Sequence, residues 1–155
     1  MDFGGVCSSP DNKDNTLDLP GCEATLDHLR SRNYRLVLVS FCGARQAQDI
    51  REVLQRHANQ RQGRPLFDRL VFVKDKATKV HVCHLLGASV MIDDTEEVLA
   101  TFAPTKILTV HFGTEAVPDW AAVQSLLEQT DLPIYPACPR LNKVLEPLVY
   151  EEEPM

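Results

Sequence analysis

The sequence alternates short apolar runs with stretches of helical periodicity, and this alternation restricts the fold more than any other feature. Such a pattern is typical of a parallel sheet with helices packed on both of its faces. Parallel strands need long crossover connections, and the helical stretches supply them. We therefore expect an α/β fold, a three-layer α/β/α Rossmann-like sandwich with a mostly parallel sheet.

The individual elements follow from the same pattern. Apolar runs predict strands at residues 36–39, 70–73, 89–92 and 107–110, with Phe41 to Gly43 as a turn. Helical periodicity predicts helices at about 23–30, 44–57, 80–86, 96–100 and 118–129. Gly87 is expected to end the helix 80–86, because glycine adopts the left-handed conformation at the least cost.

The beginning of the sheet is unusual. A sheet of this kind needs a buried apolar strand before its first acidic loop, yet only Met1 precedes Asp2. Either the sequence begins inside its first strand, which is then truncated, or that strand is built differently. A missing central strand would expose apolar edges.

Length and composition favour one globular domain. The chain has 155 residues, 44% of them apolar and 25% charged, which suits a single core. We expect the core domain at residues 1–130. Residues 131–155 are expected to form a proline-rich, extended tail with an acidic end at Glu151–Glu153.

Charge and cysteine content exclude several classes of protein. The net charge of −6 disfavours nonspecific binding to nucleic acid or to anionic lipid. The apolar runs are shorter than the roughly 18 residues of a membrane span, and the N-terminus lacks a signal-peptide pattern. Five cysteines without a Cys-x-x-Cys spacing suggest reduced thiols and a cytoplasmic protein.

Reactive side chains follow the predicted strands in turn. Asp2 opens the first loop, Ser40 follows the strand 36–39, and Asp93 with Asp94 follows the strand 89–92. A lysine, one of Lys74, Lys76 and Lys79, follows the strand 70–73. Ligands bind at the carboxyl ends of parallel strands. Carboxylates suit magnesium, and a lysine with a hydroxyl suits phosphate.

These motifs, in their order along the chain, resemble those of haloacid dehalogenase-like hydrolases. They are Asp-x-x-Gly-Val, a strand ending in Ser, a Lys at a helix start and Ile-Asp-Asp, between Asp2 and Leu127. The resemblance implies a magnesium-dependent phosphatase that acts on a phosphorylated substrate through an aspartyl-phosphate. The implied catalytic residues are Asp2, Ser40 and Lys79, the phosphate-binding residues Ser40, Cys42, Gly43 and Lys79, and the magnesium ligands Asp2, Gly4, Asp93 and Asp94.

Gly4 departs from the family pattern. The family usually has an aspartate at this position, which serves as acid toward the leaving group and then as base toward water. Such help is worth about 10²–10⁴-fold in rate, whereas the backbone carbonyl that binds metal survives in Gly4. An alternative is therefore a weakly active or inactive member that serves as a binding or scaffolding protein. A receiver-like domain is disfavoured, because its acidic pair would follow the first strand.

Other features have simpler explanations. His81, Cys83 and His84 lack a second ligand pair, which disfavours a zinc site. Trp120 is expected to pack in the core, and residues 12–18 form either a lid or an ordinary loop. The connection after Val6 and the segment between the strands 36–39 and 70–73 are short, so we expect little or no cap and a site open to small or macromolecular substrates.

Overall fold

Four parallel strands form the sheet layer of the computed structural model, which describes residues 1–150. Strand β1 (Val37–Phe41) pairs with β2 (Arg69–Val73), and β3 (Val90–Asp93) pairs with β4 (Leu108–His111). Both pairs are parallel, as the sequence predicts. Two-stranded sheets of this kind need a bridge between them to make one continuous layer.

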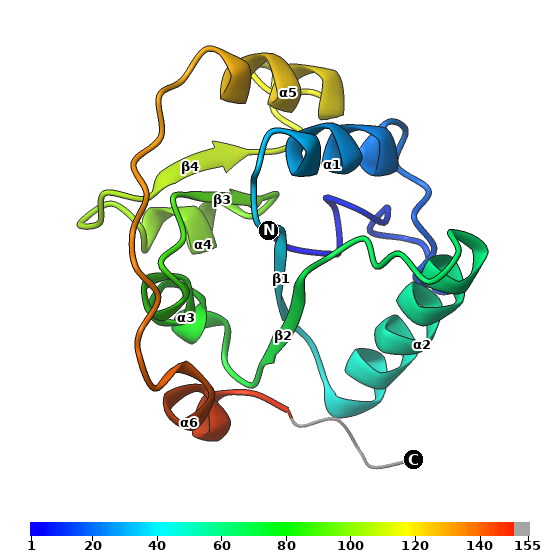
Figure 1. Ribbon diagram of the computed structural model, residues 1–155, viewed down its shortest axis with the longest axis horizontal. Helices are drawn as coiled ribbons and strands as arrows, with labels where there is room; N and C mark the ends of the chain where they lie inside the picture. Colours follow the sequence, from blue (N-terminus) through cyan, green and yellow to red (C-terminus); the bar gives the residue numbers. More distant parts are fainter. Residues whose placement is uncertain (151–155) are drawn as a thin grey trace.

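The segment Met1–Asp2 is that bridge. The Met1 nitrogen donates a hydrogen bond to the Val37 carbonyl (2.8 Å), and the Val39 amide donates to the Met1 carbonyl (2.8 Å). On the other side, the Asp2 amide donates to the Ile92 carbonyl (2.9 Å). Figure 1 accordingly places the N-terminus between β1 and β3. The expected first strand is present as a very short segment, and it carries Asp2 into the middle of the sheet.

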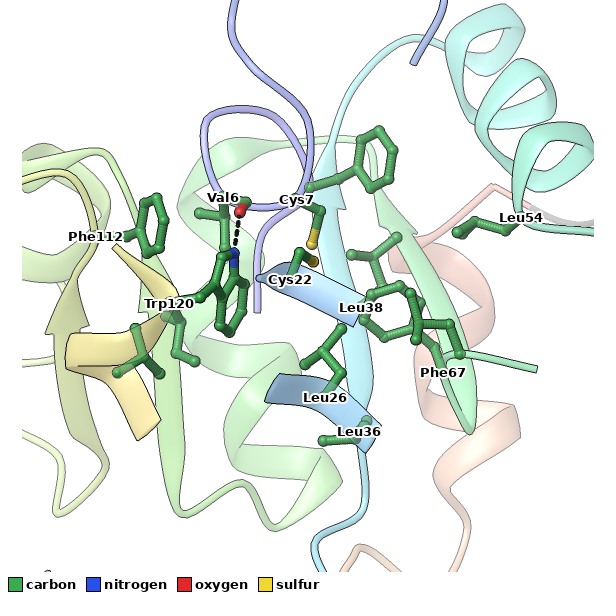
Figure 2. Packing of buried hydrophobic residues seen from close by; sticks show 14 of the residues in the cluster. Val6, Cys7, Cys22, Leu26, Leu36, Leu38, Leu54, Phe67, Phe112 and Trp120 are labelled. Atoms are coloured by element: carbon green, nitrogen blue, oxygen red, sulfur yellow. Dashed lines mark hydrogen bonds between the residues drawn. The ribbon is translucent and has the colours of Figure 1, made fainter. Parts of the chain in front are cut away.

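Two apolar clusters cover the two faces of the sheet, so the predicted three-layer sandwich is confirmed. Helices α1 (Cys22–Ser31), α2 (Ala44–Gln60) and α5 (Trp120–Glu128) pack on one face. Helices α3 (Lys79–Leu86), α4 (Glu96–Ala100) and α6 (Leu141–Leu145) pack on the other. Alternation along the strands divides the sheet residues between the faces. Leu38, Phe72 and Ile92 join the first cluster, part of which Figure 2 shows, and Val39, Val71 and Met91 join the second.

Most predicted boundaries are confirmed to within a few residues. Helix α4 has the predicted range, and Gly87 ends α3 with φ of +70°, as expected. The turn predicted from Phe41 onward was wrong at its first residue, because β1 continues through Ser40 and Phe41 in register with β2. Helix α5 begins at Trp120 rather than at Pro118, because Asp119 caps it by accepting a hydrogen bond from the Ala122 amide (2.9 Å).

The tail is extended at first and then helical. Residues 131–138 have no regular structure, but α6 and a short 3₁₀ helix (Glu146–Leu148) follow, which the sequence pattern did not predict. Leu145 is buried in the second cluster, and Val149 forms an antiparallel bridge with Val73. The predicted acidic end at Glu151–Glu153 lies outside the described residues. The boundary at residue 130 stays a prediction.

Among residues 1–150, no helix combines the length and the hydropathy that a membrane crossing needs.

Candidate active site

A buried ion cluster lies where the central strands end. The ammonium of Lys79 contacts Asp2 Oδ1 at 3.0 Å and Asp93 Oδ2 at 2.9 Å. Lys79 is 3% exposed and Asp93 fully buried. Asp2 comes from the bridging segment, Asp93 from the end of β3 and Lys79 from the first residue of α3. Residues far apart in the sequence therefore meet at one point, as predicted.

The structure also shows which lysine reaches this cluster. Lys79 starts α3 and points back to the sheet, whereas Lys74 is exposed and lies over the ring of Tyr150. Lys76 lies 3.8 Å from the exposed carboxylate of Glu97. Of the three lysines considered from the sequence, Lys79 alone is buried against the carboxylates.

Asp94 adds a third carboxylate, and Gly5 makes room for it. Oxygen atoms of Asp2, Asp93 and Asp94, one from each, lie within 4.8 Å of one another. A Cβ atom at Gly5 would lie 1.9 Å from Asp94 Oδ2, and Gly5 also has φ of +76°. The positive φ favours glycine at this position, and any side chain there would displace the Asp94 carboxylate. The sequence pattern indicated a turn at Gly5 and gave no sign of its contact with Asp94.

Backbone contacts hold the acidic pair in place. Asp93 Oδ1 accepts a hydrogen bond from the Thr95 amide (2.9 Å), so both oxygens of Asp93 have partners. His111, at the end of β4, lies with Nε2 3.1 Å from the carbonyl oxygen of Asp94. Sequence reasoning missed His111, although its position directly after the predicted strand 107–110 is a signal that could have found it.

The cluster suits a hard divalent cation. Three carboxylates against one ammonium leave two negative charges uncompensated, and a divalent cation would balance them. All three candidate side-chain ligands offer oxygen, which magnesium prefers. The residues present therefore fit magnesium.

The pKa directions in the cluster agree with an excess of negative charge. Burial raises the pKa of Asp2 despite the neighbouring Lys79, and Asp93 acts in the same direction as burial. Burial followed by the charge of Asp93 raises the pKa of Asp94. Burial alone would lower the pKa of Lys79, but Asp2 and Asp93 outweigh it and the net shift is upward. The lysine thus stays charged at neutral pH, and the carboxylates lack counter-charge.

Three of the four predicted phosphate-binding residues lie from β1 to the start of α2, and the fourth, Lys79, begins α3. Ser40 is buried in the strand next to the Met1–Asp2 segment, since Val39 bonds to Met1. Burial raises the pKa of the Cys42 thiol to about 11, with a further contribution from Asp2. Gly43 precedes α2 and provides no capping side chain. Amides at such a helix start attract anions.

Gly4 lies at the surface of the loop that comes after Asp2. It is exposed, and no heavy atom of the described chain lies within 4 Å of the position that a Cβ would take. The loop folds around the Phe3 carbonyl, which accepts hydrogen bonds from the Val6 and Cys7 amides (3.2 and 2.8 Å). Trp120 fixes the loop to α5, since its indole nitrogen donates to the Val6 carbonyl (2.8 Å), as Figure 2 shows. The expected packing role of Trp120 is confirmed, because it is fully buried.

The sequence also drew attention to His81, Cys83 and His84 and to the loop at residues 12–18. In the chain as described, the one cluster with metal-ligand geometry is that of Asp2, Asp93 and Asp94. His81 and His84 are exposed on α3, while Cys83 is buried against Met91. The loop at residues 12–18 is held by its own polar contacts, among them Ser9 with Asp18 (2.6 Å) and Asn12 with Thr16 (2.6 Å). Its role as a lid stays a prediction.

Comparison with known proteins identifies the fold. No protein-family model and no curated protein sequence matches the chain. A solved structure is similar, that of D,D-heptose 1.7-bisphosphate phosphatase from B. bronchiseptica in complex with magnesium and phosphate. The two share 16% sequence identity with a TM-score of 0.55, over 94% of each chain. This likeness, with the parallel sheet and its helical layers, shows that the chain has the fold of the haloacid dehalogenase-like hydrolases, as its sequence predicts.

Proposed function

We propose that this protein is a magnesium-dependent phosphatase that acts through an aspartyl-phosphate at Asp2. The observation that carries the proposal is the convergence of three carboxylates and the buried Lys79 at the centre of the sheet. Burying such charge is costly. A cluster that serves only stability would be expected to balance its charges internally, and this one does not.

Each residue has a role that its position supports. Asp2 is the nucleophile, and one of its oxygens forms the bond to phosphorus. Lys79 holds Asp2 in position and offsets negative charge as the phosphoryl group approaches. Ser40, with Cys42 and Gly43 at the start of α2, binds the phosphoryl oxygens.

Asp2, Asp93, Asp94 and the backbone carbonyl of Gly4 would hold the magnesium ion. When bound, the ion would offset the charge of the carboxylates and of the phosphoryl oxygens, so that two anions can meet. His111 and Thr95 keep the acidic pair oriented. Gly5 leaves the space that Asp94 occupies.

The substrate is a phosphorylated compound, small or macromolecular. The similar phosphatase structure contains magnesium and phosphate, and this supports the cofactor and the substrate class. The described cysteines are all free, which supports a cytoplasmic location for the activity.

The test is the release of phosphate from p-nitrophenyl phosphate, with magnesium and with EDTA. We expect turnover that needs magnesium and that Asp2→Asn abolishes, because asparagine cannot serve as the nucleophile. Asp11→Asn is the matched control, since Asp11 is exposed on a surface loop. This variant should retain full activity.

Metal binding is measured separately by titration calorimetry with magnesium. Asp94→Asn should weaken binding, while Asp11→Asn should leave it unchanged. A folded wild-type protein that binds magnesium but releases no phosphate would contradict the phosphatase and favour the non-catalytic binding or scaffolding protein.

A further inference from the structure

Residue 4, in the loop that follows Asp2, is a glycine and carries no side chain. Gly4 is the second residue after Asp2 and is exposed. Nothing in the described chain lies within 4 Å of where its side chain would begin, and its φ is not positive. Residue 4 therefore brings no protic side chain to the loop that follows the nucleophile.

The other polar groups of the cluster are engaged. Lys79 donates to two buried carboxylates at 3.0 and 2.9 Å, and losing its proton would leave both without their cation. Asp93 accepts hydrogen bonds at both oxygens and is fully buried. Asp94 lies against Gly5, within the set of metal ligands. Each of these three groups is committed to a neighbour in the cluster, and we assign the role of acid to none of them.

From this geometry we propose, resting on the function proposed above, that the substrates are phosphoryl compounds whose leaving group departs as a stable anion. Aryl phosphates and acyl phosphates have this chemistry, because a phenolate or a carboxylate leaves without protonation. Simple alkyl phosphates lack it, since an alkoxide needs a proton as it departs.

The first step needs no proton from a side chain of the protein. A carboxylate oxygen of Asp2 attacks phosphorus and forms the new O–P bond. The P–O bond to the leaving group breaks, and its electron pair goes to the leaving oxygen. The product anion takes a proton from solvent only after it has departed.

The second step uses a carboxylate as its leaving group. A water oxygen attacks the phosphorus of the aspartyl-phosphate, and the Asp2 oxygen departs with the electron pair of the broken bond. The proton of the water passes to solvent, and inorganic phosphate is released. Since no side chain at residue 4 accepts that proton, this step is slow, and kcat/KM rather than kcat reports the first step.

The experiment compares kcat/KM for acetyl, p-nitrophenyl, phenyl and glycerol phosphate, all with magnesium. Wild-type protein is measured beside Gly4→Asp, which restores an acid, and Gly4→Asn, which has the same size and no acidic proton. A Cβ atom at residue 4 would meet no atom beyond its chain neighbours within 4 Å, so neither variant clashes at its first side-chain carbon. Asp2→Asn provides the background rate.

We expect wild type to act on acetyl and p-nitrophenyl phosphate, more slowly on phenyl phosphate and hardly at all on glycerol phosphate, and Gly4→Asn to show the same dependence on the leaving group. Gly4→Asp should gain about 10²–10⁴-fold on glycerol phosphate and little on p-nitrophenyl phosphate. The faster of the acetyl and p-nitrophenyl substrates tells whether the site suits acyl or aryl compounds.

Wild-type activity that depends little on the leaving group, or an equal gain from Gly4→Asp on all substrates, would overturn this inference and leave the phosphatase intact. No turnover of any of the four substrates above the Asp2→Asn background would overturn both.

Discussion

The two ends of the described chain contact the sheet in different ways. Residues 1–8 begin inside it, whereas residues 131–150 pass around its outside. Residues 1–8 enter the sheet between β1 and β3, and Phe3, Val6 and Cys7 are at most 1% exposed. Residues 131–150 run along the outside, where Ile134 is 97% exposed and Leu145 is the buried anchor. In Figure 1 the later segment leaves α5 and passes around the sheet to α6. Stability and site geometry should therefore depend on the first segment more than on the second.

The largest effect is expected from Phe3→Ala. Phe3 is 1% exposed in the first apolar cluster, and its carbonyl organises the loop beside Asp2. Removing the ring should lower the free energy of unfolding by roughly 3 to 5 kcal/mol. Urea unfolding followed by Trp120 fluorescence measures this. A loss below about 1 kcal/mol would mean that the segment is not part of the core.

Leu145→Ala tests the anchor of the outer segment. Leu145 is 1% exposed, but α6 has only five residues and can shift to fill part of the cavity. We expect a loss of about 2 to 3 kcal/mol, the lower part of the range for buried leucine. The same urea titration measures this loss. If Leu145→Ala and Phe3→Ala lower the free energy of unfolding equally, the two segments contribute equally to stability.

A comparison of Gly5→Ala with Gly4→Ala tests whether magnesium binding depends on the position of Asp94 or on the loop as a whole. A Cβ at Gly5 would collide with Asp94, whereas a Cβ at Gly4 meets open space. Displacing a ligand in this way should weaken magnesium binding about 10- to 100-fold, and Gly4→Ala should bind as wild type does. Calorimetric titration with magnesium measures the affinity of both variants. Equal affinities in the two variants would argue against Asp94 as a ligand.

Gly87→Ala tests the contact between the outer segment and α3. Gly87 has φ of +70°, and a Cβ there would lie 2.6 Å from the Tyr135 carbonyl oxygen. Gly63→Ala is the control, because Gly63 also has positive φ but has open space around its Cβ position. Backbone strain costs about 1 to 3 kcal/mol in either variant, so Gly87→Ala should lower the thermal midpoint further than Gly63→Ala. Equal midpoints would show that the tail moves aside freely.

The smallest effect is expected from Ile134→Ser. Ile134 is almost completely exposed, so no apolar contact is lost. The free energy of unfolding should change by less than about 0.5 kcal/mol. A clear loss in thermal unfolding would show that this part of the segment packs against something after all.

Part of the fold and of the candidate site was predictable because local patterns determine it. The strand at 70–73 and the helix at 96–100 follow from apolar runs and periodicities of a few residues. The end of α3 at Gly87 follows from the backbone freedom of glycine. Helix α6 was missed, because five residues after a proline-rich stretch carry too little periodicity to distinguish a helix from a loop.

By itself, the sequence determined the order of strands and helices and indicated reactive residues after every strand except β4. Only the tertiary structure decided that Met1 and Asp2 lie between β1 and β3 and connect them, because the hydrogen-bond partners of their backbone groups lie on those two strands. It also selected Lys79 among three nearby lysines and seated Asp94 against Gly5. Burial and charge pairing are set by neighbours distant in sequence, so no local pattern could reveal these choices.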